Sequence, residues 1–495
     1  MKIVFVSSEV VPFSKSGGLG DVCGALPAAL AARGHTVVTV SPRYGMVDRH
    51  AHEATDRNVE VGIHAAGFRH HVRFLESVRD GVHHLLVEHP MFDRPHLYGD
   101  KEGAYRDNPI RFSVLCRAAI EAARRVPING TPLGDDVVFH AHDWHAALMP
   151  VFLEALYRPL GIMAWAPCVL TIHNIAHQGH FSGAVFHDLE LAPRWFRPSS
   201  LEWYGDVNLL KGGILAADHI TTVSPTFAKE IGTPQGGFGL DGVIRHRGSA
   251  LTGILNGIDT QVWDPATDPH LEHNYDVSNW RQGKAACKAA LQKELGLPVD
   301  PSVPMVGSVG RLDPQKGIEL LIDSIPWLVE QGAQVVVLGS ASAAHRSYEE
   351  RLRALANAHS DQVRAWIGFS EPVAHRIEAA CDIFAMPSRF EPCGLNQLYS
   401  MRYGAVPVVR ATGGLTDSVP NADIHRGTGT GFTFKTFTAA ALRDALYQAL
   451  WTLRTQPEGF AGLVERGMRR DASWNLAAAR YEEVYDTALS RRAAL

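Results

Sequence analysis

Short apolar runs alternate with longer amphipathic stretches along the first half of this chain. Each run has the length of a buried strand, and the runs cover residues 3–6, 36–40, 137–140 and 168–173. Helical patterns extend from Asp21 to Ala32 and from Pro109 to Arg125. Asp80-Gly81 is typical of a hairpin turn, with residues 72–75 and 82–87 as its arms. The alternation predicts βαβ units and a mostly parallel sheet.

The same pattern starts again in the second half. Strand-like runs cover residues 303–309, 334–338, 363–367 and 383–386, and a helical pattern extends from Gly317 to Gln331. The alternation of strand-like and helix-like segments is interrupted between Asn256 and Pro304. This stretch is therefore the best candidate for a crossover between domains. A chain of 495 residues is also too long for one compact core. We therefore predict an α/β protein of two doubly wound Rossmann-like domains facing a deep interdomain cleft.

The predicted domain boundaries are residues 1–255 for the first domain and 256–475 for the second. Residues 476–495 contain a last helical pattern, from Leu476 to Leu489, with apolar residues on one face. Packing of this helix back against the first domain is one arrangement that the pattern leaves open.

Composition narrows the class of protein. The formal net charge is −5, so the chain lacks the excess of basic residues that is typical of nucleic-acid-binding proteins. This argues against a nucleic-acid partner. No apolar run is long enough for a bilayer, and residues 1–9 are too short in apolar length for a signal segment. The six cysteines lack any C-x-x-C spacing. We therefore expect a reduced, cytoplasmic protein that does not bind membranes.

Two similar loops stand near opposite ends of the chain. Residues 15–21 contain Gly17-Gly18 after the first apolar run, and residues 412–417 contain Gly413-Gly414 after the run 405–409. Paired glycines at a helix start let backbone N–H groups approach an anion closely. A single loop of this kind is as often only a tight turn, whereas two in similar domains favour a ligand held between them.

Two further loops in the second half carry charges at the ends of predicted strands, where open parallel sheets bind ligands. In the first, Arg311 and Lys316 bracket a turn stiffened by Pro314, a good arrangement for a diphosphate. In the second, Glu391 lies at a loop apex where it could face a sugar or cap the next helix. Cys393 has no histidine partner or metal spacing, which favours a packed or glycan-contacting role.

Histidines cluster after two strands of the first half, at positions 140, 142, 145, 173 and 177. Histidines at alternate strand positions share a face, as in metallohydrolases. A metal-dependent hydrolase is therefore a rival hypothesis. It leaves Lys15, Arg311 and Lys316 without a role, and histidines at strand ends also bind sugar hydroxyls.

In this order along the chain, the motifs resemble those of bacterial glycogen synthases and plant starch synthases. The matching segments are residues 15–22, 140–145, 173–174, 256–259, 310–317, 388–394 and 412–415. The resemblance implies a retaining glucosyltransferase of the two-domain GT-B architecture. It would move glucose from ADP-glucose to the non-reducing end of glycogen or another α-1,4-glucan, with no metal and no cofactor.

The resemblance also implies roles for individual residues. Glu391, His173, Lys316 and Arg311 are the catalytic candidates. Lys316 and Arg311, with Lys15, would bind the donor's phosphates, and Glu391 would lie near the glucosyl group. His173 and Asn256 would contact that group, and Asp143 would line the acceptor side. The remaining candidates for substrate binding are Gly17, Gly18, Asp21, Asn174, Cys393, Gly394, Leu395, Thr412, Gly413 and Gly414, whose glycine pairs would supply backbone N–H donors.

One position departs from the wider group of retaining GT-B enzymes, many of which hold the ribose with a second glutamate. Tyr399 stands at that place, as is typical of glycogen synthases, so ribose contacts stay unassigned. The residues do not distinguish adenine from uracil or indicate an oligomeric state. A glucan-binding regulator without catalysis is a third hypothesis, and the presence of every charged candidate argues against it.

Overall fold

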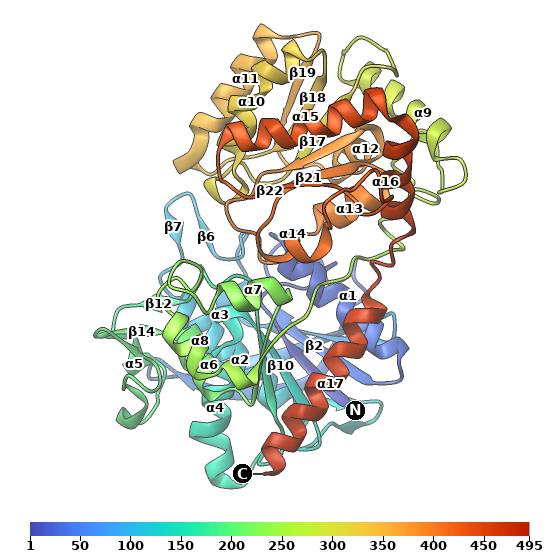
Figure 1. The fold of residues 1–495 in the computed structure, drawn as a ribbon. Coiled ribbons are helices and arrows are strands. Elements are labelled where there is room, and N and C mark those ends of the chain that lie inside the picture. Colours follow the sequence, from blue (N-terminus) through green and yellow to red (C-terminus); the bar gives the residue numbers. More distant parts are fainter. Residues whose placement is uncertain (495) are drawn as a thin grey trace. The chain divides into compact units, whose positions relative to one another are not determined.

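The computed structural model describes residues 1–494, which form two compact units (Figure 1). Unit 1 consists of residues 1–257 together with the chain from Trp474 onward, and unit 2 of Ile258–Ser473. No helix within residues 1–494 is long and apolar enough to cross a membrane.

A largely parallel sheet forms the centre of unit 1. Its strands lie in the order β16-β15-β11-β10-β1-β2-β5-β4-β3. Neighbours from β16 to β5 pair in parallel, whereas β4 pairs antiparallel with both β5 and β3. The bounds are β1 (Lys2–Val6), β2 (Thr36–Pro42), β3 (Thr55–Ala65), β4 (Phe68–Arg79), β5 (Val82–Glu88), β10 (Val138–His142), β11 (Cys168–Ile172), β15 (His219–Thr222) and β16 (Leu251–Gly253).

The hairpin predicted at Asp80-Gly81 is confirmed, since it joins β4 to β5. Both residues have positive φ, 49° at Asp80 and 76° at Gly81, as the tight hairpin turn requires. Every residue of β10 and β11 is buried. Burial on both faces explains why β11 is a mostly apolar run without alternation, whereas β10 also buries the polar rings of His140 and His142.

The helices of unit 1 connect these strands. The longer ones are α1 (Gly18–Ala32), α2 (Asn108–Arg125), α6 (Leu209–Ala216) and α17 (Trp474–Ala493), and shorter ones are α3 (Asp143–Ala146), α4 (Leu148–Phe152), α5 (Val185–Asp188), α7 (Pro225–Glu230) and α8 (Asp241–His246). Short strands β12 (His180–Phe181), β14 (Asp206–Asn208) and β13 (Glu202–Trp203) form a small separate sheet.

Helix α17 contains the last predicted helix and packs inside unit 1 against α1. Its residues Tyr481 and Tyr485 share a buried core with Leu26 of α1 and Val169 of β11. The hydroxyl of Tyr485 also lies 2.9 Å from Nδ1 of His140 in β10. The apolar face of α17 therefore supports the strands that carry the histidine motif.

Unit 2 has a parallel sheet in the order β19-β18-β17-β20-β21-β22. Its strands are β17 (Met305–Val309), β18 (Gln334–Gly339), β19 (Val363–Ile367), β20 (Ile383–Met386), β21 (Val406–Arg410) and β22 (Phe432–Phe434). Its helices are α9 (Trp280–Glu294), α10 (Ile318–Glu330), α11 (Arg346–Ala358), α12 (Glu371–Ala380), α13 (Asn396–Arg402), α14 (Gly413–Ser418), α15 (Ala439–Thr455) and α16 (Pro457–Arg469). The predicted class, an α/β protein with two doubly wound Rossmann-like units, is confirmed.

The stretch from Asn256 to Pro304 is not a free crossover. Helix α9 packs against α12, with Cys287 and Leu291 in the core of unit 2. The chain passes into unit 2 at residues 257–258 and leaves it at 473–474. The polar surface of residues 264–278 suggested a linker because composition does not show which few apolar side chains anchor a segment.

Candidate active site

The first candidate loop of unit 1 lies between β1 and α1. Nζ of Lys15 and Oδ1 of Asp21 are 2.7 Å apart, and both side chains are about a third exposed or less. Gly17 precedes the helix in an extended conformation, with open space where a side chain would lie. The N-terminus of α1 therefore offers positive potential next to the Lys15 ammonium, an arrangement that suits a phosphate.

Glu9 holds this loop in place, and sequence reasoning missed it. The carboxylate is buried and accepts hydrogen bonds from the Ser16 backbone N–H (2.5 Å), the Ser16 hydroxyl (2.7 Å) and the Tyr98 hydroxyl. Its position three residues past the end of β1, at the carboxyl end of a parallel strand, is the signal that could have identified it.

Asp143 and His173 come together because they follow the adjacent parallel strands β10 and β11. Oδ1 of Asp143 accepts the backbone N–H of His173 at 2.7 Å and that of Asn174 at 3.4 Å. Burial raises the pKa of Asp143 to about 7, against the opposing effect of these two hydrogen bonds. Asp143 itself has a φ of 55°, a conformation that aspartate tolerates better than most residues.

His142 is a second residue that sequence reasoning did not assign to the site. Its Nδ1 lies 2.9 Å from Nε2 of His173, and its own Nε2 is buried with no partner among residues 1–494. Burial lowers the pKa of both rings, that of His173 to about 3, so both are neutral. Orphaned buried N–H groups are rare. The favoured tautomer therefore has His142 donating from Nδ1, which leaves His173 with its proton on Nδ1.

His140 and His145 are also buried in packed surroundings, whereas His177 is exposed. His140 contacts the hydroxyls of Tyr485 and Thr171, and the ring of His145 stacks on that of Tyr98. Within residues 1–494, no group of three or more His, Cys, Asp and Glu side chains is arranged to hold a metal ion. The hydrolase hypothesis therefore finds no support in this arrangement. Asn256 is buried as well, and its Oδ1 has no partner among the described residues.

In unit 2, Lys316 and Glu391 form an ion pair. Nζ of Lys316 lies 2.7 Å from Oε2 of Glu391, and the Ser388 hydroxyl donates to the same oxygen at 3.0 Å. Gly317 makes this approach possible because it has a φ of 63° and a Cβ there would lie 2.0 Å from the Pro387 carbonyl oxygen. Arg311 pairs with Asp313 at 2.9 Å, and its side chain is 58% exposed.

The second glycine loop packs directly on the loop that carries Glu391. A Cβ at Gly413 would lie 2.0 Å from the Glu391 carbonyl oxygen, and one at Gly414 would lie 2.2 Å from that of Cys393. The Gly414 N–H donates to the Glu391 carbonyl at 3.0 Å. This use of the N–H differs from the expectation that it points to a phosphate. The glycines are needed because two backbones approach closely.

The remaining candidates lie around these two loops. Cys393 is buried, Gly394 has a φ of 74°, Leu395 precedes α13 and Thr412 precedes α14. Tyr399 is buried against Trp263, with ring centroids 3.7 Å apart. Its ring fills the interior at the position where a ribose-binding glutamate stands in other enzymes.

Comparison with known proteins shows to which protein family the chain belongs. Residues 2–246 match the family model for the starch synthase catalytic domain, and residues 292–452 match that for glycosyl transferases group 1. The chain is 47% identical to a glycogen synthase of Anaeromyxobacter dehalogenans, over 98% of this chain and 99% of the relative. It is 46% identical to soluble starch synthase 1 of Solanum tuberosum, over 98% of this chain and 78% of the relative.

Among solved structures, the catalytic domain of starch synthase IV from Arabidopsis thaliana, bound to ADP and acarbose, matches with a TM-score of 0.90. That chain is 35% identical, and the match covers 99% of both chains. The fold and the matches define a glycosyltransferase of the GT-B class. Within that class, the chain belongs to the family of starch synthases and bacterial glycogen synthases.

Proposed function

We propose that this enzyme is a glycogen synthase. It transfers glucose from ADP-glucose to the non-reducing end of an α-1,4-glucan with retention of configuration and releases ADP. The observation that carries the proposal is the pairing of Lys316 with Glu391, because it puts an ammonium and a carboxylate side by side where the loops after the paired strands β17 and β20 meet. Cleavage of a glycosyl phosphate bond develops charge of both signs at neighbouring atoms, and such a pair suits both.

Arg311 and Lys316 are assigned to the donor's diphosphate in unit 2. Arg311 is largely exposed, and its guanidinium presents a planar fork of N–H donors. The Lys316 ammonium has three N–H groups, of which the contact with Glu391 uses one. The others are assigned to phosphate oxygens, so that negative charge growing on the leaving group is stabilised without a metal. In unit 1, Lys15 and the N-terminus of α1 are the corresponding phosphate candidates.

Glu391 is assigned to the glucosyl ring, where a carboxylate opposes the positive charge of an oxocarbenium-like transition state. In unit 1, His173 and Asn256 are assigned to the hydroxyls of the glucosyl group. The tautomer set by His142 makes His173 a donor at Nδ1, and the orphaned Oδ1 of Asn256 is an acceptor. Asp143 is assigned to the acceptor side. Attack from the face that ADP leaves accounts for retention.

The proposal also includes the cellular location and the binding partners of the enzyme. A cytoplasmic location is supported by the six cysteines, which are buried and form no disulfide in the described part of the chain. Neither a nucleic acid nor a membrane is proposed as a partner, given the net charge of −5.

A parallel assay with radiolabelled ADP-glucose and UDP-glucose on glycogen tests this function. We expect label in the glucan with ADP-glucose, a much smaller rate with UDP-glucose, and an α-1,4 linkage that β-amylase digests. Lys316→Ala serves as the inactive reference. Absence of incorporation from either donor, with retained binding of glycogen, would favour the non-catalytic regulator instead.

A further inference from the structure

A pocket of about 620 Å³ lies in unit 1, away from the residues assigned to catalysis. The end of α17 forms one side of it, and the segments before and after α6 form others. It shares no lining residue with the candidate active site. The charged residues among those that line it are Glu154, Arg197, Asp218, Arg247, Arg491 and Arg492.

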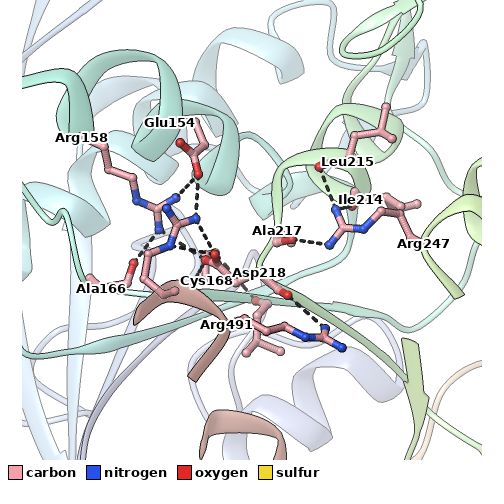
Figure 2. A network of polar contacts seen from close by, with 12 residues as sticks. Glu154, Arg158, Ala166, Cys168, Ile214, Leu215, Ala217, Asp218, Arg247 and Arg491 are labelled. Carbon is pink, nitrogen blue, oxygen red and sulfur yellow. Dashed lines mark hydrogen bonds and ion pairs between the residues drawn. The ribbon is translucent and has the colours of Figure 1, made fainter. Parts of the chain in front are cut away.

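The two carboxylates of this pocket are already neutralised. Arg492 contacts Glu154 at 2.7 Å and donates from Nε to Asp218 at 2.8 Å. Arg158, which does not line the pocket, pairs with the same two carboxylates, with Asp218 at 3.3 Å (Figure 2). These four side chains form a balanced network that leaves no carboxylate for the other arginines.

The other three arginines meet no carboxylate within ion-pair distance among residues 1–494. Arg247 donates to the backbone carbonyls of Ile214, Leu215 and Ala217 at 2.6–2.8 Å, as Figure 2 shows. Arg491 donates to the carbonyls of Asp218 (3.3 Å) and Ser249 (2.5 Å) and lies 2.9 Å from Nδ1 of His219. Arg197 is exposed at the rim. Carbonyl partners fix a guanidinium in place but do not cancel its charge.

The electrostatic consequences appear in neighbouring groups. Burial first, and then the charge of Arg491, lower the pKa of Arg247 below its ordinary value, and the charge of Asp218 opposes this only in part. Burial and the charges of Arg491 and Arg247 lower the pKa of His219 to about 4. The His219 ring is therefore neutral and does not change the net charge of the pocket. Counted over residues 1–494, the pocket therefore has an excess of positive charge that an anion would relieve.

Donor groups also remain for such an anion. The bonds of Arg247 and Arg491 to described residues occupy Nη1 and part of Nη2, and leave the Nε edge of each guanidinium. That edge is the one used for bidentate contacts to oxyanions. The indole Nε1 of Trp195, which also lines the pocket, is buried and has no partner among the described residues.

We propose that this pocket is a binding site for a phosphate group, held by Arg197, Arg247 and Arg491. A phosphate dianion matches the excess charge better than a carboxylate does, and its oxygens match the two guanidinium edges. The ligand is either inorganic phosphate or the phosphate ester of a small metabolite. Binding would link the end of α17 to the segments around α6.

Calorimetric titration of the full-length enzyme tests the site. ADP is kept saturating so that the donor's phosphate contacts are occupied, and ionic strength is held constant with NaCl. Inorganic phosphate and glycerol 3-phosphate are titrated separately, and the tighter ligand identifies the source. We expect saturable binding by the wild type that is about tenfold or more weaker in Arg197→Ala and in Arg491→Lys, since each loses charge-assisted hydrogen bonds.

Arg194→Ala is the matched control, because Arg194 is exposed on the same short segment as Arg197 but does not line the pocket. It should bind phosphate as the wild type does, and so should Arg311→Ala. Circular dichroism confirms that each variant is folded. Absence of saturable binding in the wild type, or unchanged affinity in both Arg197→Ala and Arg491→Lys, would overturn the proposal. Because binding is the readout, this result is independent of the glucosyltransferase assay.

Discussion

Nζ of Lys316 lies 2.7 Å from Oε2 of Glu391, across a separation of 75 residues in the chain. The Glu391 side chain is only 6% exposed, so Lys316 compensates a carboxylate that solvent hardly reaches. The two residues assigned to opposite charges of the transition state are therefore electrostatically coupled before any substrate binds. Removal of either one changes the environment of the other.

This coupling predicts a non-additive double-mutant cycle. Lys316→Ala should lower kcat by about 10²–10³-fold and Glu391→Ala by about 10²-fold, as expected for a preorganised charge. The double variant should lose less than the product of the two, because Lys316→Ala on its own also leaves the nearly buried Glu391 carboxylate without its ion-pair partner. Steady-state kinetics with ADP-glucose give the cycle. Arg351→Ala, on the exposed surface of unit 2, is the control that should combine additively with Lys316→Ala.

Glu391→Gln separates charge from shape. The amide oxygen can still accept from Lys316, but the negative charge opposite the sugar is gone. We expect kcat to fall nearly as far as in Glu391→Ala. A Gln variant with near-normal kcat would show that Glu391 acts through hydrogen bonding alone.

The two glycine loops should respond differently to alanine. In Gly414→Ala the new methyl group would overlap the Cys393 carbonyl, so the loop of Glu391 must shift. We expect a loss of about 1–3 kcal/mol of stability together with a fall in kcat. Gly17→Ala has space for the methyl group and an extended backbone, so its stability should be unchanged. Thermal unfolding and kinetics of the two variants check this. Equal destabilisation would contradict the packing argument.

The pKa of Asp143 predicts the pH dependence of stability. Burial raises it from 3.8 to about 7. The folded protein therefore holds a proton between about pH 7 and pH 4 that the unfolded chain releases, and this stabilises the fold as pH falls. His173 acts oppositely, because its pKa falls from 6.5 to about 3 and the unfolded chain takes up the proton first. Acid destabilisation by the buried histidines is thus partly offset by Asp143.

In Asp143→Asn the offset disappears while an oxygen remains to accept the His173 N–H. The free energy of unfolding should then fall more steeply between pH 7 and pH 4 than in the wild type. The added slope approaches about 1.4 kcal/mol per pH unit for one proton. Urea denaturation at a series of pH values measures it. Parallel pH profiles for the two proteins would contradict the raised pKa.

His142 should act as a positioning residue for His173. His142→Phe keeps a ring against Phe5 and His140 but removes the hydrogen bond to His173. We expect kcat to fall more than KM changes, because the His173 ring and its tautomer are no longer held. His142→Asn, whose amide can donate in place of Nδ1–H, should recover part of the loss. If both variants lose only stability, the role of His142 is packing alone.

Catalysis should not depend on a divalent metal, because lysine and arginine side chains are assigned to the diphosphate. Activity in EDTA should equal that in buffer, and the purified enzyme should contain no stoichiometric zinc. Elemental analysis and a chelator titration measure both. Loss of activity with EDTA that zinc or magnesium restores would favour a metal-dependent reaction.

Local sequence pattern was sufficient to predict many of the turns and strands of this protein. The turn at Asp80-Gly81 and the strands β10 and β11 were predicted because turn chemistry and apolar runs depend on neighbouring residues. The charged residues at strand ends could likewise be located, since parallel strands place their carboxyl ends at one edge. The crossover was predicted too broadly, because the apolar face of α9 reports burial but not the unit against which it is buried.

Local sequence pattern is enough to specify the two doubly wound units and the residue types available for chemistry. The pairing of Lys316 with Glu391, the hydrogen bond from the Gly414 N–H to the Glu391 carbonyl and the support of His140 by α17 follow instead from tertiary packing. Each of these contacts joins residues far apart in the chain. Hydrophobic periodicity shows which face of an element is buried, whereas the partner across that face follows from the packing of the whole unit.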